Sequence, residues 1–304
     1  MALAPITLFV YNRPAHTRRT VEALQGNISA KDSDLIIYSD APKNPDAADA
    51  VCEVRKYIRA LSGFKSVSII ERDKNLGLAN SIIDGVTSVV NECGRIIVLE
   101  DDLVTSPYFL NFMNTALERY SHEEMVMQIS GNMFPISSGD AIPGTFFCKM
   151  TTSWGWATWD RAWRKLEPDA DKLIKMIIAK KLQKEFDMGF SYFHMLEMQA
   201  RDEVDSWAVR WYASVFLAGG LCLHPSSTLV INIGHDKSGT HCGSAGDYGV
   251  SLTNKIPTTF PLSIEESRQG REALESFNRS INRPMQGSAW MRLLARAKTV
   301  LRSL

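Results

Sequence analysis

The segment RIIVLEDDLVTSPYFLNFMNTALERY, residues 95–120, joins an apolar run, three carboxylates and an amphipathic pattern. Residues 96–99 are uninterrupted apolar residues, as in a strand buried on both faces of a parallel sheet. Apolar side chains then recur at helical spacing over residues 109–120. Ser106 is placed to cap this helix, with Pro107 as its first residue. The segment therefore predicts a strand–helix unit with a buried strand.

Three further strand–helix units precede this one. Apolar strands are expected at residues 6–11, 34–40 and 67–72, and a helical pattern follows each of them. Successive units with continuous apolar strands form a sheet that is covered by helices on both faces. We therefore predict an α/β fold with a Rossmann-like, mixed but mostly parallel sheet flanked by helices.

The pattern changes after residue 120. Strands are expected at 125–131 and 144–150, and helices at roughly 169–186 and 192–217. Between them, TTSWGWATWDRAW contains four of the seven tryptophans within 13 residues. We interpret the second half as an elaboration of the same domain, and expect three parts: residues 1–120, residues 121–260 and a C-terminal helical tail, residues 261–304.

The composition argues against several classes of protein. Lysine plus arginine equals aspartate plus glutamate at 34 each, so no net charge attracts nucleic acid over long range. The five cysteines are scattered without a CxxC pair, which indicates free thiols in a reducing compartment and supports neither a disulfide framework nor a zinc site. The N-terminus lacks a basic leader, and the apolar runs are too short to span a bilayer. We expect a cytoplasmic protein, soluble or peripheral.

Charged residues follow several of the predicted strands. Glu100, Asp101 and Asp102 end the strand quoted first, Arg13 follows the first strand and Asp40 the second. Ligands in such sheets bind beyond the carboxyl ends of the strands. Carboxylates there bind a hard divalent cation or act as acid and base in pairs, the alternative being a solvated turn. No GxGxxG or GxxxxGK[ST] motif supports a dinucleotide or P-loop site.

Several short segments, taken in order, resemble the GT-A glycosyltransferases. They are VYNRP, YSD, NLGLANSI and LEDD, followed by GWATWDRAWRKLEP, VDSW and NIGHDKSGTH, and they cover about residues 4–243. The sequence is most similar to the N-acetylglucosaminyltransferase I type and its bacterial relatives near glycosyltransferase family 2. The resemblance implies transfer of a sugar from a nucleotide-sugar donor to a glycan or lipid-linked glycan acceptor. The expected setting is bacterial surface polysaccharide, such as lipopolysaccharide, with N-acetylglucosamine from UDP as the first donor to test.

The resemblance also implies roles for the triplet. Asp102 would bind Mn²⁺ or Mg²⁺, which neutralises charge on the departing diphosphate without a proton. Asp101 would contact the ribose, and Glu100 the hydroxyls of the transferred sugar. A cation and hydroxyl donors would then offset the repulsion among three adjacent carboxylates. Residues 1–120 would form the donor half.

Three further residues are implied in donor binding. Arg13 would contact the diphosphate or the nucleoside, and Asp40 would accept a hydrogen bond from the base. Asn75 lies where the family has another nucleotide contact, although the family residue there often differs. The alternatives are a helix-end arginine, a turn aspartate and a turn asparagine.

The resemblance implies that direct displacement inverts the anomeric carbon and requires a base for the acceptor hydroxyl. Asp205, two residues before a tryptophan in DEVDSWAVRW, matches the family's aspartate, whereas Asp202 and Glu203 are interpreted as a solvated helix face. Residues 121–260 would form the acceptor half, with a mobile glycine-rich loop. Aromatic residues there either contact a sugar or pack in the core, and the loop histidines match no zinc pattern. The predicted acceptor or lid residues are Trp154, Trp156, Trp207, His235 and His241.

Two other functional classes compete with a transferase. A sugar-nucleotide pyrophosphorylase would carry a glycine-rich basic signature after its first strand, which VYNRPAHTRR lacks. A non-catalytic nucleotide-sugar or glycan-binding module would bind without turnover. Residues 290–304 form a basic amphipathic pattern, which predicts contact with an anionic membrane surface or packing on protein.

Overall fold

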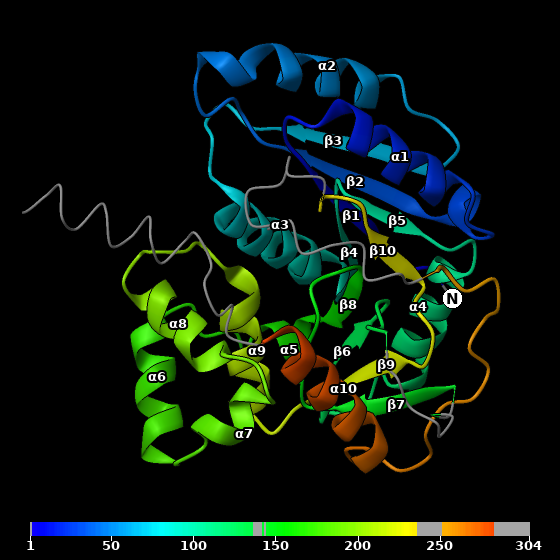
Figure 1. Ribbon diagram of the computed structural model, residues 1–304. Helices are drawn as coiled ribbons and strands as arrows, with labels where there is room; N and C mark the ends of the chain where they lie inside the picture. Colours follow the sequence, from blue (N-terminus) through cyan, green and yellow to red (C-terminus); the bar gives the residue numbers. More distant parts are fainter. Residues whose placement is uncertain (1, 136–141, 143, 236–250, 283–304) are drawn as a thin grey trace, which may run out of the picture.

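A computed structural model of the protein describes residues 2–135, 142, 144–235 and 251–282. An eight-stranded sheet forms its centre (Figure 1). Along this sheet the strands lie in the order β3 (Ser66–Glu71), β2 (Asp34–Ser39), β1 (Ile6–Val10), β4 (Arg95–Glu100), β8 (Trp156–Trp159), β6 (Val126–Ser130), β9 (Leu221–Pro225) and β7 (Thr145–Cys148). A second, two-stranded sheet pairs β5 (Leu103–Thr105) with β10 (Val230–Asn232).

Helices cover both faces of the sheet. They are α1 (Pro14–Gln25), α2 (Ala48–Arg59), α3 (Leu78–Cys93), α4 (Phe109–Arg119), α5 (Asp160–Trp163), α6 (Ala170–Ala179), α7 (Gln183–Asp187), α8 (Tyr192–Ala200), α9 (Trp207–Leu217) and α10 (Arg268–Ile281). In Figure 1, α1 and α2 lie at one end of the molecule, and α6, α7 and α8 form a group at the other. The predicted α/β class is confirmed.

The first four strands of this order form the parallel half of the sheet. Leu8 of β1 lies opposite Ile37 of β2 on one side and Leu99 of β4 on the other. Leu8 belongs to the core under α1, α2 and α4, whereas its neighbour Phe9 belongs to the core under α3 and α9. Alternate side chains are therefore buried on opposite faces, as predicted for a sheet covered on both sides.

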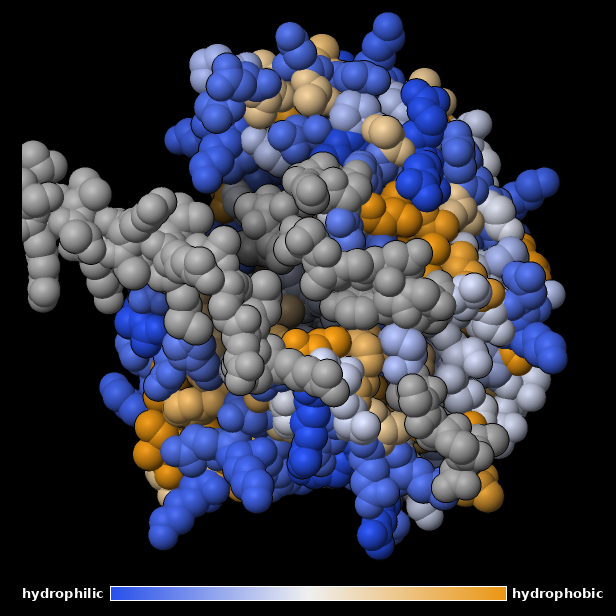
Figure 2. Space-filling model, viewed as in Figure 1, coloured by the Kyte–Doolittle hydropathy of each residue, from blue (hydrophilic) through white to orange (hydrophobic). Residues whose placement is uncertain are grey.

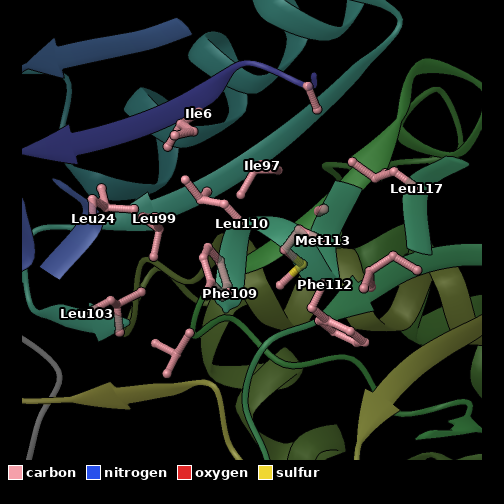
Figure 3. Close-up of a cluster of buried hydrophobic side chains, with 14 of the residues drawn as sticks. Ile6, Leu24, Ile97, Leu99, Leu103, Phe109, Leu110, Phe112, Met113 and Leu117 are labelled. Carbon is pink, nitrogen blue, oxygen red and sulfur yellow. The ribbon is translucent and has the colours of Figure 1, made fainter. Parts of the chain in front are cut away.

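The helix α4 packs one apolar face on this sheet. Figure 3 shows its side chains directed toward residues of β1 and β4. All six residues predicted for that face are buried: Phe109, Phe112, Met113, Ala116, Leu117 and Tyr120.

The predicted start of α4 is wrong by two residues. The helix begins at Phe109, and Tyr108 occupies the cap position instead of Ser106. Ser106 and Pro107 belong to a preceding turn, because the N–H of Phe109 donates to the carbonyl of Ser106 at 3.1 Å. The Ser106 hydroxyl still accepts from the N–H of Tyr108 at 3.3 Å.

The second half joins the first through an antiparallel strand. The tryptophan-rich segment contains β8, which runs antiparallel to both β4 and β6, and both strands predicted beyond residue 120 are present as β6 and β7. The helix expected over 192–217 is two helices, α8 and α9. A turn between them contains Asp202 at a φ of 55°, a left-handed conformation that ends a helix.

The direction of the strands brings distant residues to one edge of the sheet. β1, β2 and β4 are mutually parallel. β6 runs in the same direction, because β8 lies between β4 and β6 in the sheet and is antiparallel to both. The residues that follow these strands therefore lie along one edge. This edge is where ligands bind in open α/β sheets.

Several predictions concern segments that the structure does not describe. His241, Cys242 and residues 290–304 lie outside the described ranges, and so does most of the glycine-rich loop. The other four cysteines are free thiols. Within residues 2–135, 142, 144–235 and 251–282, no helix has the length and apolar character needed to cross a membrane.

His224 of β9 is a fully buried imidazole in the second half of the sheet. Its Nε2 lies 2.8 Å from the carbonyl oxygen of Met150, and its ring stacks on Phe146 at 5.4 Å. Burial lowers the pKa of His224 to about 4, although the bond to Met150 opposes this shift. In the folded protein the imidazole of His224 is therefore neutral, and its protonation favours the unfolded chain.

The first prediction is a loss of stability in acid that depends on His224. The stabilisation that the neutral imidazole of His224 provides is fully present above pH 6.5, the ordinary histidine pKa, and is lost as the pH falls toward 4. Between pH 7 and pH 5, the free energy of unfolding of the parent should fall by roughly 2 kcal/mol more than that of His224→Gln. Urea denaturation at both pH values measures the difference, and parallel pH profiles would contradict it.

Candidate functional site

The centre of the candidate site is an ion-pair cluster between the ends of β1 and β4. Nη2 of Arg13 lies 3.0 Å from Oδ2 of Asp102 and also bonds Oδ1 of Asp101. Both aspartates are buried, with 4% and 5% of their surface exposed. The strands thus bring together three of the residues predicted for the donor site.

This cluster has more negative than positive charge. Burial and the charges of Asp102 and Asp101 raise the pKa of Glu100 to about 8. Burial also raises the pKa of Asp101, although the guanidinium of Arg13 opposes the shift. Burial disfavours the charged guanidinium, but the two aspartates more than offset this and raise the pKa of Arg13. The carboxylates of Asp101 and Asp102 share one cation, so the site can accept further positive charge.

The carboxylates are suited to a magnesium-like cation. Such ions are held by one or two protein carboxylates together with substrate phosphates and water, so a complete protein ligand set is unnecessary. The described residues contain no group of three or more metal-ligating side chains. The guanidinium of Arg13 nevertheless shows that the oxygens of Asp101 and Asp102 converge on one positive group. Asp102, with Asp101 beside it, would hold the ion.

The segment after β10 lies against this cluster. Antiparallel pairing of β10 with β5 carries the chain back to the triplet, and the N–H of Ile233 donates to the carbonyl of Asp102 at 2.8 Å. A Cβ on Gly234 would lie 2.3 Å from Oδ2 of Asp102 and 3.0 Å from Nη1 of Arg13. A side chain at position 234 would therefore overlap the Asp102 carboxylate unless one of the two moved. The sequence assigned Gly234 to the flexible glycine-rich loop, but its approach to Asp102 was not predicted.

Asp40 and Asn75 position the loop before α3. The carboxylate of Asp40 accepts from the N–H groups of Ala41 at 2.9 Å, Leu76 at 3.0 Å and Gly77 at 3.0 Å. Asn75 donates to the carbonyl of Ala41 at 2.6 Å. These bonds hold both side chains at the edge of the sheet beside β2. Contact with a nucleotide base stays a prediction for both residues.

Asp205 precedes α9 and lies at the same edge. A Cβ on Gly77 would be 3.6 Å from Oδ2 of Asp205, so the loop before α9 meets the loop before α3. The carboxylate is half exposed, and its Oδ1 lies 3.6 Å from Nη2 of Arg210. Glu203, by contrast, forms an exposed ion pair with Arg201. The position of Asp205 is compatible with a base that solvent and acceptor can reach.

A pocket of about 300 Å³ is lined by Ser206 and Trp207, the two residues that follow Asp205. Two predicted acceptor residues, Trp154 and Trp207, line it together with residues from α8 and α9. Because Val98 of β4 pairs with Trp156 of β8, Trp154 lies beyond the start of β8, next to the end of β4. The predicted lid residue His235 meets the ring of Trp154 edge to face at 5.4 Å. On the face shown in Figure 2, hydrophobic residues gather near the middle, and polar residues cover the ends.

The acceptor role predicted for Trp156 needs correction. Its side chain is completely buried and stacks on Trp207 at 5.0 Å, with Trp163 at 5.7 Å and Trp211 at 6.3 Å. A ring enclosed by other rings has no face left for a sugar. Trp156 therefore belongs to the core between the sheet, α5 and α9.

The pocket also has polar residues that the sequence analysis missed. Asn132, two residues beyond β6, lines it and is buried, and its Nδ2 has no hydrogen-bond partner among the described residues. Ser206 lines it while its hydroxyl accepts from the N–H of Val209 at 3.3 Å. A polar residue directly after a predicted strand was the available signal for Asn132, the same signal that selected Asp40.

No protein-family model and no curated protein matches the chain. Among solved structures, the mannosyltransferase PcManGT from Pyrobaculum calidifontis in complex with GDP-Man and Mn²⁺ overlaps with a TM-score of 0.37 at 10% identity, over 71% of this chain and 75% of that one. Residues 1–349 of TarS from S. aureus overlap with a TM-score of 0.42 at 10% identity, over 74% of this chain and 59% of that one. Structural overlaps as partial as these assign no activity to the chain.

The second prediction concerns Gly234. Gly234→Ala should force the Asp102 carboxylate or the 232–235 segment to move, because the added methyl would overlap the carboxylate. The free energy of unfolding should fall by about 1–3 kcal/mol, the usual cost of overpacking. Gly26→Ala is the matched control, since Gly26 has a helical φ of −73° and its Cβ would lie 3.4 Å or more from its neighbours. Equal stability of both variants in denaturant titrations would show that the segment does not press on Asp102.

Proposed function

We propose that the chain is an inverting, metal-dependent glycosyltransferase that uses a nucleotide-sugar donor. The observation that supports this most is that a negatively charged carboxylate cluster and a separate, half-exposed carboxylate lie at one edge of the sheet. The cluster contains Asp102 and Arg13, and the separate carboxylate is Asp205. The ordered motifs of the sequence, which resemble GT-A glycosyltransferases, include the same residues.

The donor would lie over the ends of β1, β2 and β4, within residues 1–120. Asp102 would hold Mn²⁺ or Mg²⁺, which supplies positive charge as the bond to the leaving diphosphate breaks. Asp101 would accept from the ribose, Glu100 would accept from the transferred sugar, and Arg13 would contact the diphosphate. Asp40 and Asn75, fixed by backbone hydrogen bonds, would present the loop that receives the base.

The acceptor would lie in the pocket between the end of β4 and α9, within residues 121–260. Asp205 would take the proton of the acceptor hydroxyl as that oxygen attacks the anomeric carbon. Trp154 would offer an apolar face to a sugar ring, with His235 next to it. Trp207 lines the same pocket but is buried and stacked on Trp156, so it would support the pocket wall from the core. Our first choice of donor is UDP-N-acetylglucosamine. A lipid-linked glycan on the cytoplasmic membrane face is the acceptor we favour, which residues 290–304 would help to approach.

The third prediction tests the donor side. In thermal-shift and calorimetric titrations with UDP, GDP, CMP and dTDP sugars, the parent should be stabilised by one donor only when Mn²⁺ is present. At 100 times the dissociation constant this amounts to about 2.7 kcal/mol. Asp102→Asn should fold but lose the Mn²⁺-dependent shift, because it removes the charge that holds the ion.

The control for this experiment is Asp49→Asn, which removes an exposed carboxylate on α2. It should bind donor and Mn²⁺ like the parent. If Asp102→Asn does the same, Asp102 is not the metal ligand. Donor binding without transfer or hydrolysis in the parent would instead indicate a binding module.

The fourth prediction tests the base. Asp205→Asn should bind donor as the parent does but transfer sugar roughly 10²–10⁴-fold more slowly, the usual range for removal of a general base. Asp202→Asn is the matched control, because asparagine also tolerates the left-handed φ of 55° at that position. The rate is measured as release of nucleoside diphosphate with a glycan acceptor. Retention of the anomeric configuration in the product would exclude this role for Asp205.

A further inference from the structure

We propose that Arg13 is a resident cation of the Asp101–Asp102 pair, which metal and diphosphate displace together. This inference rests on the proposed function and adds an order to it. The guanidinium would occupy the carboxylates in the free protein, and it would turn to the diphosphate only when a divalent ion takes its place. Arg13 is then a positioning residue that couples the binding of two ligands.

The contacts of Arg13 leave part of its guanidinium unused. The single nitrogen Nη2 serves both Asp101 and Asp102, whereas Nη1 is buried and has no hydrogen-bond partner in the described part of the chain. Arginine binds carboxylate and phosphate most strongly when two nitrogens engage two oxygens side by side. A diphosphate would offer several such oxygens. Both carboxylates therefore contact the guanidinium, whereas one guanidinium nitrogen makes no hydrogen bond to the described residues.

Metal and guanidinium would compete for the same oxygen. A divalent ion binds carboxylate oxygens at about 2.0–2.6 Å. Nη2 of Arg13 lies 3.0 Å from Oδ2 of Asp102, and Gly234 closes the space on another side. A second cation held against the guanidinium would also be repelled by it. Movement of the Arg13 side chain away from Asp102 would therefore open Oδ2 to the ion.

The backbone of Arg13 can stay in place during this exchange. Its carbonyl accepts from the N–H of Thr17 at 2.9 Å and from the hydroxyl of Thr17 at 2.9 Å, which anchors it at the start of α1. The guanidinium is carried on a long side chain that is 17% exposed, so solvent already reaches it. A change of side-chain conformation is therefore enough to move the charge.

The exchange makes the two ligands cooperative. Metal alone would break the contacts of Arg13 and leave that charge unpaired in a mostly buried place, which is costly. Diphosphate alone would meet the carboxylates of Asp101 and Asp102, which repel it. Bound together, the ion neutralises the carboxylates and the diphosphate receives the arginine. By linkage, each ligand raises the affinity for the other by the same factor.

A purely structural arginine would give different results. If Arg13 only tied β1 to β4, its removal would lower stability and would not increase affinity for a metal ion. If it is a resident cation, its removal should free the carboxylates for the metal. The two roles therefore predict opposite changes in Mn²⁺ affinity.

The fifth prediction is tested with Mn²⁺ and inorganic pyrophosphate, so no knowledge of the donor is needed. Free Mn²⁺ is measured by electron paramagnetic resonance at pH 8 for the parent, Arg13→Met and Arg13→Lys, with and without pyrophosphate. Arg13→Met should bind Mn²⁺ alone at least tenfold more tightly than the parent, with Arg13→Lys between the two. Pyrophosphate should strengthen Mn²⁺ binding strongly in the parent and at least tenfold less in Arg13→Met.

Thermal unfolding of the same samples guards against loss of fold. Arg13→Met should be less stable than the parent without metal, and Mn²⁺ should raise its midpoint more than that of the parent. Arg13→Lys keeps the charge and provides a folded comparison if Arg13→Met does not fold. Equal or weaker Mn²⁺ affinity in the folded variants would overturn the inference. Failure of every form, the parent included, to bind Mn²⁺ with pyrophosphate would instead count against the proposed metal-dependent function.

Discussion

Two buried carboxylates after β4, those of Asp101 and Asp102, share one guanidinium, and the surrounding structure is arranged around that imbalance. Arg13 is placed there by the junction of β1 and α1, and Gly234 by the pairing of β10 with β5. Burying like charges is costly unless cations and donors face them. A site of this kind is stable enough to fold and still able to bind more positive charge. That property connects the architecture of the sheet to the chemistry we propose.

The core and the candidate site also share structural elements. Trp207 stacks on Trp156 in the core and lines the pocket, and Asp205 lies two residues before it. The start of α9 is therefore held by the packing of several large rings, each of which would cost about 3–5 kcal/mol to truncate to alanine. A carboxylate attached to such a helix has a well-defined position although it is half exposed.

The sequence predicted what depends on local patterns. The positions of the first four strands along the chain, the buried face of α4 and the residues that follow β1, β2 and β4 could be predicted, because periodicity and strand ends are visible in one chain. Features that depend on distant contacts were not accessible. The enclosure of Trp156, the turn that delays α4 to Phe109 and the approach of Gly234 to Asp102 each require a partner far away in sequence.

The pocket has two walls of different character. Its α9 wall belongs to the tryptophan core, where most side chains are buried. Its α8 wall contributes Tyr192 and Met195, and α8 has a single buried residue, Leu196. Substitutions on α8 are therefore expected to cost less stability than substitutions on α9, which disturb the core and Asp205 together. Related chains that diverge in the molecule bound by this pocket are expected to differ first along α8, with α9 held nearly constant.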